Sequence, residues 1–227
     1  MNNYPIRINK YLALKKISTR RGADELVEQK KVFINGKLAV LGSKVNEQDE
    51  VEVKGAEKKE YLYFTYNKPI GIETNSPRAD LFPLGRLDKI SHGLLILTND
   101  GRITDQLLNP KYFHEKEYVV RTSNKLRSSF KQKMEMGVKI EGLPAQAGYI
   151  TKPCKVKIID DFNFRIILTE GKKHQIRRMC SALFQEVADL KRERIMNIKL
   201  GKLMPNALRE IKGEELTTFL NQVLHQT

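Results

Sequence analysis

The sequence predicts a two-domain α+β protein in which a small N-terminal module precedes a larger domain built on a sheet. Three observations support this fold class. Residues 1–54 contain two segments with helical periodicity followed by a hairpin signal. Residues 55–60, Gly-Ala-Glu-Lys-Lys-Glu, are small or charged and are typical of a linker. In residues 61–227, strand-length apolar segments alternate with short helical patterns, which predicts a mixed, largely antiparallel sheet flanked by helices.

The N-terminal module begins with two predicted amphipathic helices. Ser18 and Thr19 are N-cap candidates for the second helix, because their hydroxyl oxygens can accept from free backbone amides. The apolar positions at helical spacing are Ile8, Tyr11 and Leu12 in the first helix and Ala23, Leu26 and Val27 in the second.

A predicted hairpin follows the two helices. Residues 32–34 and 37–40 flank Asn35-Gly36, which is the strongest short-range hairpin signal. Residues 51–53 alternate between apolar and polar side chains and predict one more strand of this module.

The larger domain opens with a predicted strand at residues 61–66, which are rich in aromatic and β-branched side chains. Asn67-Lys68-Pro69-Ile70-Gly71 ends this strand. Further strands are expected at residues 94–98, 118–120, 155–160, 164–169 and 190–201. Helices are marked by Ile103, Leu107 and Leu108, by Leu126, Phe130 and Met134, by Ile176, Met179, Cys180, Leu183 and Phe184, and by Leu216, Phe219, Leu220, Val223 and Leu224.

Residues 85–101 join a turn, a buried strand and a second turn. Arg86 and Asp88 lie on the first turn, and Asn99-Asp100-Gly101 forms the second. An acid held on a turn beside a buried strand is rigidly positioned, as a catalytic carboxylate must be. The alternative is an aspartate that caps its own backbone. That alternative suits Asp100 better than Asp88.

The net charge of +14, from 41 basic and 27 acidic residues, indicates a polyanionic partner, with nucleic acid favoured over membrane. No apolar run approaches the roughly 20 residues that a spanning helix needs. Four basic residues crowd the starts of the two N-terminal helices, where phosphate binds readily. These four residues are Arg7, Lys10, Arg20 and Arg21. The alternative is that their charges are simply solvated at the surface.

The remaining composition predicts a cytoplasmic monomer without metal or cofactor. Cys154 and Cys180 are far apart and indicate free thiols of a reducing compartment. Residues 1–5 lack the apolar core of a signal peptide. His174 has no Cys, His or carboxylate three or four residues further on, so we expect no metal there.

Several motifs resemble those of the RsuA/RluB/RluE/RluF family of RNA pseudouridine synthases. Residues 85–101 match Gly-Arg-Leu-Asp-x-x-Ser-x-Gly-Leu-Leu-x-Leu-Thr-Asn-Asp-Gly, and residues 67–71 match Asn-Lys-Pro-x-Gly. Residues 116–120 match Lys-x-Tyr-x-Val, and residues 170–179 match Glu-Gly-x-x-x-Gln-Ile-Arg-Arg-Met. The segment of residues 74–82 is shorter than the corresponding segment of most members of this family. The segments most similar to the RluF group are 114–120, 153–157 and 194–197.

The N-terminal module resembles the small alpha-L RNA-binding fold of a ribosomal small-subunit protein. The resemblance rests on Arg-x-x-Lys-Tyr-Leu, Ser-Thr-Arg-Arg-x-Ala-Asp and Val-x-Ile-Asn-Gly-Lys. It implies that this module binds structured RNA.

The family resemblance implies a reaction that converts uridine to pseudouridine within an RNA chain. It implies that Asp88 is the nucleophile, acting on the sugar or on the base, and that Arg177 pairs with it. Tyr118 would stack on the extruded base and could shuttle the proton of carbon 5. Arg86 would hold the phosphate backbone of the RNA in place or fill the space that the extruded base leaves. Lys173 and Arg178 would contact phosphate.

The similarity to the RluF group implies a 23S rRNA stem-loop as the target, with a tRNA anticodon as a second candidate. A 16S rRNA target, as for RsuA, is the competing interpretation. On the residues alone, Tyr118 could be an ordinary core tyrosine and the basic helix residues could be solvated.

Other function classes also remain open. A non-catalytic RNA-binding protein would share the charge but would not need Asp88, Tyr118 and Arg177 together. A metal-dependent nuclease or a glycosidase needs clustered or paired carboxylates. Asp88 and Asp100 lie at opposite ends of a predicted strand, which argues against both.

Overall fold

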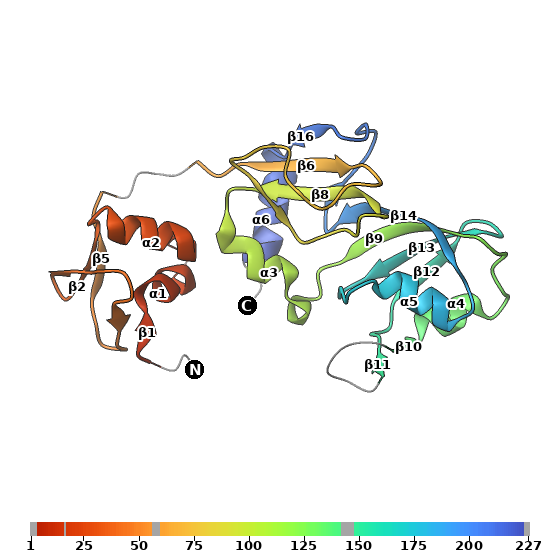
Figure 1. Cartoon of the computed structure of the whole chain (residues 1–227), viewed down its shortest axis with the longest axis horizontal. Helices are drawn as coiled ribbons and strands as arrows, with labels where there is room; N and C mark the ends of the chain where they lie inside the picture. The colour runs from red at the N-terminus through yellow and green to blue at the C-terminus, as the bar shows by residue number, and fades with distance from the viewer. Residues whose placement is uncertain (1–3, 16, 56–59, 142–147, 225–227) are drawn as a thin grey trace. The chain divides into compact units, whose positions relative to one another are not determined.

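The computed structural model describes residues 4–15, 17–55, 60–141 and 148–224 (Figure 1). The chain folds into two compact units, one of residues 1–61 with 100–104 and one of residues 62–99 with 105–227. Most of the linker expected at residues 55–60 lies outside the described residues, because 56–59 are not among them.

The N-terminal unit packs two helices against short strands. Its elements are β1 (Ile6–Arg7), α1 (Ile8–Leu14), α2 (Arg20–Glu28), β2 (Val32–Ile34), β3 (Lys37–Leu38), β4 (Lys44–Val45) and β5 (Val51–Val53). The apolar faces predicted for the helices are buried, and the core consists of Ile8, Leu12, Ala23, Val27, Val32, Ala39 and Val45.

Local side chains fix the two helices and the hairpin. The Thr19 hydroxyl accepts a hydrogen bond from the Gly22 amide at 2.9 Å, so Thr19 is the N-cap of α2. β2 and β3 pair as predicted, with Phe33 opposite Leu38. Asn35 and Gly36 between them have φ values of 49° and 73°, as a two-residue type I′ turn requires.

One mixed sheet forms the centre of the larger unit (Figure 1). From edge to edge its strands are β12 (Lys155–Ile158), β13 (Asn163–Leu168), β9 (Lys116–Thr122), β14 (Val187–Ile195), β8 (His92–Thr98), β6 (Tyr63–Lys68) and β16 (Leu208–Glu210). β7 (Phe82–Leu84) also pairs with β8, and β15 (Ile198–Lys199) pairs with β14. The β14–β8 pair is parallel and the other pairs are antiparallel, so the predicted α+β class is confirmed.

The parallel pair brings β8 and β14 very close together at Gly93. Gly93 pairs with Arg192 and has a φ of +103°. A Cβ atom at this position would lie 2.3 Å from the Arg192 carbonyl oxygen. Only glycine fits there, because both the backbone conformation and the space exclude a side chain.

Helices α4 (Phe130–Glu135) and α5 (Gln175–Ala182) pack on the β9–β13–β12 part of the sheet (Figure 1). The predicted stripe of Ile176, Met179 and Cys180 is buried in this core. The same prediction was wrong for Phe184, which is 74% exposed with a φ of +60°. The reason is that α5 ends at Ala182, before the periodic pattern does.

Several short elements follow β8 or lie between the longer strands and helices. They are η1 (Gly101–Ile103), α3 (Thr104–Leu108), η2 (Pro110–Tyr112) and the strand pair β10 (Lys139–Ile140) with β11 (Tyr149–Ile150). The side chain of Asp100 accepts from the Arg102 amide at 3.1 Å, so this aspartate caps the backbone as expected. α4 begins at Phe130 and therefore does not include Leu126, which only packs against the core.

The C-terminal helix α6 (Gly213–Leu224) buries Phe219 and Val223. It is joined to the edge of the sheet, because Arg209 of β16 donates to both carboxylate oxygens of Glu215 at 2.6 and 3.0 Å. Asn206 adopts the left-handed conformation with a φ of +65° and accepts a hydrogen bond from the Tyr66 hydroxyl at 2.8 Å.

Candidate active site

The larger unit contains a cavity of about 650 Å³ beside the loop that bears Asp88. Its walls come from this loop, from β9 and β14 of the sheet, and from the segment that leads into α5. Asp88, Tyr118, Arg86 and Lys173, four of the residues singled out in the sequence, all line it.

Backbone and hydroxyl contacts hold the Asp88 loop. The Thr74 hydroxyl donates to the Leu87 carbonyl oxygen at 2.7 Å and accepts from the Leu87 amide at 2.9 Å. The Ser91 amide donates to the Asp88 carbonyl oxygen at 2.9 Å, which closes the turn. The shortened segment at residues 74–82 thus supports the loop directly, and the Asp88 side chain remains 36% exposed.

Two basic side chains lie near the Asp88 carboxylate. His174 Nε2 lies 3.3 Å from Asp88 Oδ1. Lys68 is fully buried and donates to the carbonyl oxygens of Pro69 and Ile72 at 3.0 and 2.7 Å. Burial lowers the pKa of Lys68, and the negative charge of Asp88 acts in the opposite direction.

Arg177 does not form the ion pair with Asp88 that the family resemblance implies, and its guanidinium group binds backbone oxygens instead. Arg177 Nη1 donates to the Val187 carbonyl oxygen at 3.0 Å, and Nη2 donates to the Ile90 carbonyl oxygen at 2.9 Å. Nη2 also lies 3.4 Å from the Ser91 hydroxyl oxygen. Arg177 therefore joins α5 and the start of β14 to the loop that carries Asp88.

Tyr118 lies on β9 in the middle of the sheet. It pairs with Ile166 of β13 on one side and with Arg192 of β14 on the other. The side chain is partly buried against the sheet core and also lines the cavity. Tyr118 thus contributes to the wall of the same cavity as Asp88.

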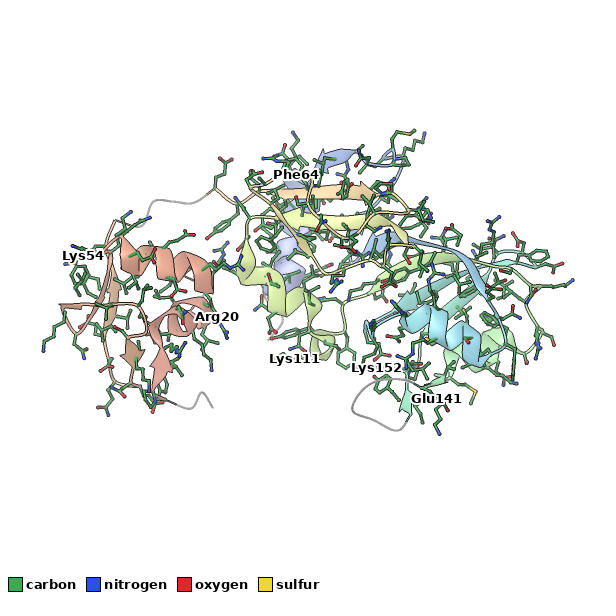
Figure 2. The ribbon with its side chains drawn as sticks, in the orientation of Figure 1. Arg20, Lys54, Phe64, Lys111, Glu141 and Lys152 are labelled. Atoms are coloured by element: carbon green, nitrogen blue, oxygen red, sulfur yellow. The ribbon has the colours of Figure 1, made fainter. Side chains whose placement is uncertain are left out.

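The expected RNA-binding residues fall into two groups. Arg86 and Lys173 are exposed at the cavity, whereas Arg178 is half-buried on α5 and donates to the Lys173 carbonyl oxygen at 3.4 Å. The second group is exposed in the N-terminal unit and consists of Arg7, Lys10, Arg20 and Arg21. Arg20 is the first residue of α2 (Figure 2). Across the described ranges, none of these four forms an ion pair with another side chain.

Sequence reasoning missed four residues that shape this site. His174 was considered only as a metal ligand, and Lys68 only as part of a turn. Lys116 and Arg192 also line the cavity. Lys116 could have been found, because it precedes Tyr118 by two residues and successive alternate positions of a strand share a face. The contribution of Arg192 depends on strand register, which the sequence does not specify.

The described part of the chain contains no group of three or more side chains suited to hold a metal ion. None of the helices in those ranges combines the length and the apolarity that crossing a bilayer requires.

Comparison with known proteins gives consistent matches. Residues 62–182 match the model of the RNA pseudouridylate synthase family, and residues 6–51 match the S4 domain. Dual-specificity RNA pseudouridine synthase RluF of Escherichia coli strain K12 is 38% identical over 93% of this chain and 77% of its own length. Ribosomal large subunit pseudouridine synthase B of Bacillus subtilis is 33% identical over 92% of this chain and 93% of its own length. Ribosomal small subunit pseudouridine synthase A of Pasteurella multocida is 31% identical, over 94% and 99%.

A solved structure described as a pseudouridylate synthase superposes on the chain with a TM-score of 0.69 and 27% sequence identity. The superposition covers 96% of this chain and 100% of the other. The match therefore extends over both units and the sheet that carries the cavity.

Proposed function

This chain belongs to the RNA pseudouridylate synthase family, and from that premise we propose that Asp88 is the nucleophile with which it isomerises a uridine of large-subunit rRNA. The observation that supports this role is the shared cavity. Asp88 and Tyr118 come from distant parts of the chain and line the same space of about 650 Å³. A nucleotide of a folded RNA can reach that space only if its base leaves the stack.

The reaction requires few protein groups. The bond from N1 of the base to C1′ of the ribose breaks, the base turns and C5 bonds to C1′. C5 then releases its proton to water and N1 takes up a proton, so the product is an isomer of the substrate. Asp88 would attack the sugar or the base ring as an anionic nucleophile. His174 and Lys68 would hold that carboxylate in place, and Tyr118 would stack on the base and could take the C5 proton.

Tritium release tests the function. RNA that contains [5-³H]uridine is incubated with the full chain, and release of tritium into water is the expected result because the reaction exchanges C5 hydrogen. Cleavage of the RNA would instead indicate a nuclease. Binding without tritium release or cleavage would indicate a non-catalytic RNA-binding protein.

The target is proposed from the relatives. We propose 23S rRNA as the target, in line with a relative named as a ribosomal large subunit synthase, and a tRNA anticodon as a second substrate, in line with relatives named as dual-specificity enzymes. The match to a small-subunit synthase keeps 16S rRNA as the alternative. Mapping pseudouridine in rRNA and tRNA of cells that lack the protein distinguishes these targets. We propose that the protein acts in the cytoplasm, where these RNAs are found, and that it acts as a monomer.

Replacing Arg177 with lysine is expected to lower kcat for tritium release by about 10- to 100-fold, with little change in KM. The lysine keeps the charge but cannot bond to Ile90 and Val187 together, so the Asp88 loop loses its connection to α5. Arg121→Lys, which changes an exposed arginine of β9 that does not line the cavity, is the control and should retain kcat. A kcat of Arg177→Lys equal to that of the wild type would contradict the positioning role.

Replacing Arg20 and Arg21 with alanine is expected to reduce the salt dependence of RNA binding. The slope of log K against log salt concentration should fall by about 1 for each phosphate contact that is lost, because fewer counterions are released. The slope is measured by filter binding between about 50 and 200 mM salt. Lys131→Ala, which removes an exposed cation of α4 in the other unit, serves as the control. An unchanged slope in the double variant would mean that these arginines do not contact phosphate.

A further inference from the structure

Two cationic side chains lie next to Tyr118 on the wall of the cavity. Arg192 of β14 pairs directly with Tyr118 of β9, and Lys116 precedes Tyr118 by two residues on the same strand. Alternate residues of a strand point to the same face. All three residues line the cavity, so they share one wall of it.

Arg192 carries a donor group without a partner. Its side chain is buried, with 2% of the residue exposed, and Nε donates to the Leu94 carbonyl oxygen at 2.7 Å. The terminal Nη2 is fully buried and has no hydrogen-bond partner among the described residues. A buried charged donor left unpaired is costly to a fold, which indicates a ligand atom that satisfies it.

Lys116 adds a second donor at the same place. Within the described ranges, its ammonium group makes a single hydrogen bond, a long one of 3.5 Å to the His114 carbonyl oxygen. Burial and the neighbouring charge of Arg192 lower the pKa of Lys116 to about 8. Two like charges are thus held together on the wall of a cavity, an arrangement that an electron-rich ligand stabilises.

The acids nearby are already engaged or lie elsewhere. Glu170 lines the cavity, but it accepts hydrogen bonds from the Tyr149 hydroxyl, the Lys152 amide and the Gln175 amide group. Glu117, between Lys116 and Tyr118, belongs to a different charged cluster, where it pairs with Arg165 and Arg194. The remaining acid of the cavity wall is Asp88, which pairs with His174.

The ligand chemistry follows from what these two side chains can and cannot do. Arginine and lysine donate hydrogen bonds and accept none. Uracil presents two carbonyl oxygens as acceptors, whereas cytosine has an amino group in place of the 4-oxygen. A buried donor-only pair beside a stacking tyrosine therefore suits uracil and leaves the cytosine amino group facing donors, which is strongly disfavoured.

We propose that Arg192 and Lys116 form the carbonyl-binding site for the target base and determine the selectivity for uridine over cytidine. This inference rests on the proposed function, because it takes the base that Asp88 acts on as the ligand. It assigns to both residues a direct contact with the substrate that complements the stacking by Tyr118.

The first test is a comparison of oxygen with sulfur in the substrate. Large-subunit rRNA transcripts are made with [5-³H]uridine or with [5-³H]4-thiouridine, and kcat/KM for tritium release is measured for each. The wild-type chain should prefer the oxygen form by about tenfold, because sulfur accepts hydrogen bonds weakly. Arg192→Met and Lys116→Met should lose that preference, and general effects of sulfur on RNA pairing cancel in the comparison of variant with wild type. Arg192→Lys, which keeps a donor, should retain part of it.

The second test measures binding without catalysis. Twelve-nucleotide oligouridylate and oligocytidylate are titrated against the full chain, and the expected preference for oligouridylate is about tenfold. The two methionine variants should bind both oligonucleotides equally. Arg121→Met, which removes an exposed cation of β9, is the control and should keep the preference.

The outcomes separate the inference from the proposed function. Absence of tritium release with a uridine preference that depends on Arg192 and Lys116 would overturn the isomerase function and leave the base-binding site intact. Tritium release with unchanged selectivity in folded Lys116→Met and Arg192→Met would overturn the inference alone. Lys116→Met removes a partly buried charge, so it keeps the test decisive if the Arg192 variant does not fold.

Discussion

Replacing Asp88 with asparagine is expected to lower the rate of tritium release from [5-³H]uridine-containing RNA by about 10⁴-fold or more. Losses of this order follow when a nucleophile is removed from an otherwise intact active site. Asparagine has nearly the same shape as aspartate but has neither its charge nor its nucleophilic oxygen. RNA affinity should change by less than about threefold, because the cavity and the basic surface persist.

Asp80→Asn is the matched control for this prediction. Asp80 is an exposed acid that pairs with Arg78 in the segment preceding the active-site loop and does not line the cavity. Its replacement should leave the rate unchanged. Substantial turnover by the Asp88 variant would exclude a nucleophilic role for this residue.

Replacing Gly93 with alanine is expected to lower the free energy of unfolding of the larger unit by about 3 kcal/mol or more. The added Cβ would lie 2.3 Å from the Arg192 carbonyl oxygen and 2.8 Å from its backbone nitrogen, and neither atom can move without breaking the β8–β14 pairing. The positive φ adds strain of about 1–3 kcal/mol. Urea unfolding of the full chain, followed by far-ultraviolet circular dichroism, measures the change.

Gly201→Ala separates the two causes. Gly201 also has a positive φ, +59°, but no atom lies within 4 Å of the Cβ position. Its replacement should cost only about 1 kcal/mol of backbone strain. If the two variants were equally stable, the close approach of β8 to β14 would not be a constraint on residue 93.

The sequence predicted those parts of the fold that depend on neighbouring residues. The Asn35-Gly36 hairpin and the Thr19 N-cap are set by local conformational preferences, and the structure shows both. The motif around Asp88 likewise predicted a loop before a buried strand, because the apolar run of β8 is continuous. The start of α4 and the end of α5 were misplaced, since apolar periodicity continues beyond the helical hydrogen bonds.

The contacts of the candidate site were less predictable, because they depend on how distant elements pack. Whether Arg177 reaches Asp88 or the backbone beside it depends on where α5 lies relative to that loop. Whether Arg192 faces Tyr118 depends on the register of β14 against β9, which includes irregularities near this point. A family motif identifies the residues, but it does not specify the atoms that they contact.

The strand order of the central sheet also determines when activity can first arise during protein synthesis. β8, which follows the loop bearing Asp88, has β6 on one side and β14 on the other, and β14 lies about a hundred residues further along the chain. Pairing over such a separation is entropically costly and slow. A growing polypeptide therefore cannot complete the wall that β9 and β14 form beside Asp88 until residues 187–195 have left the ribosome.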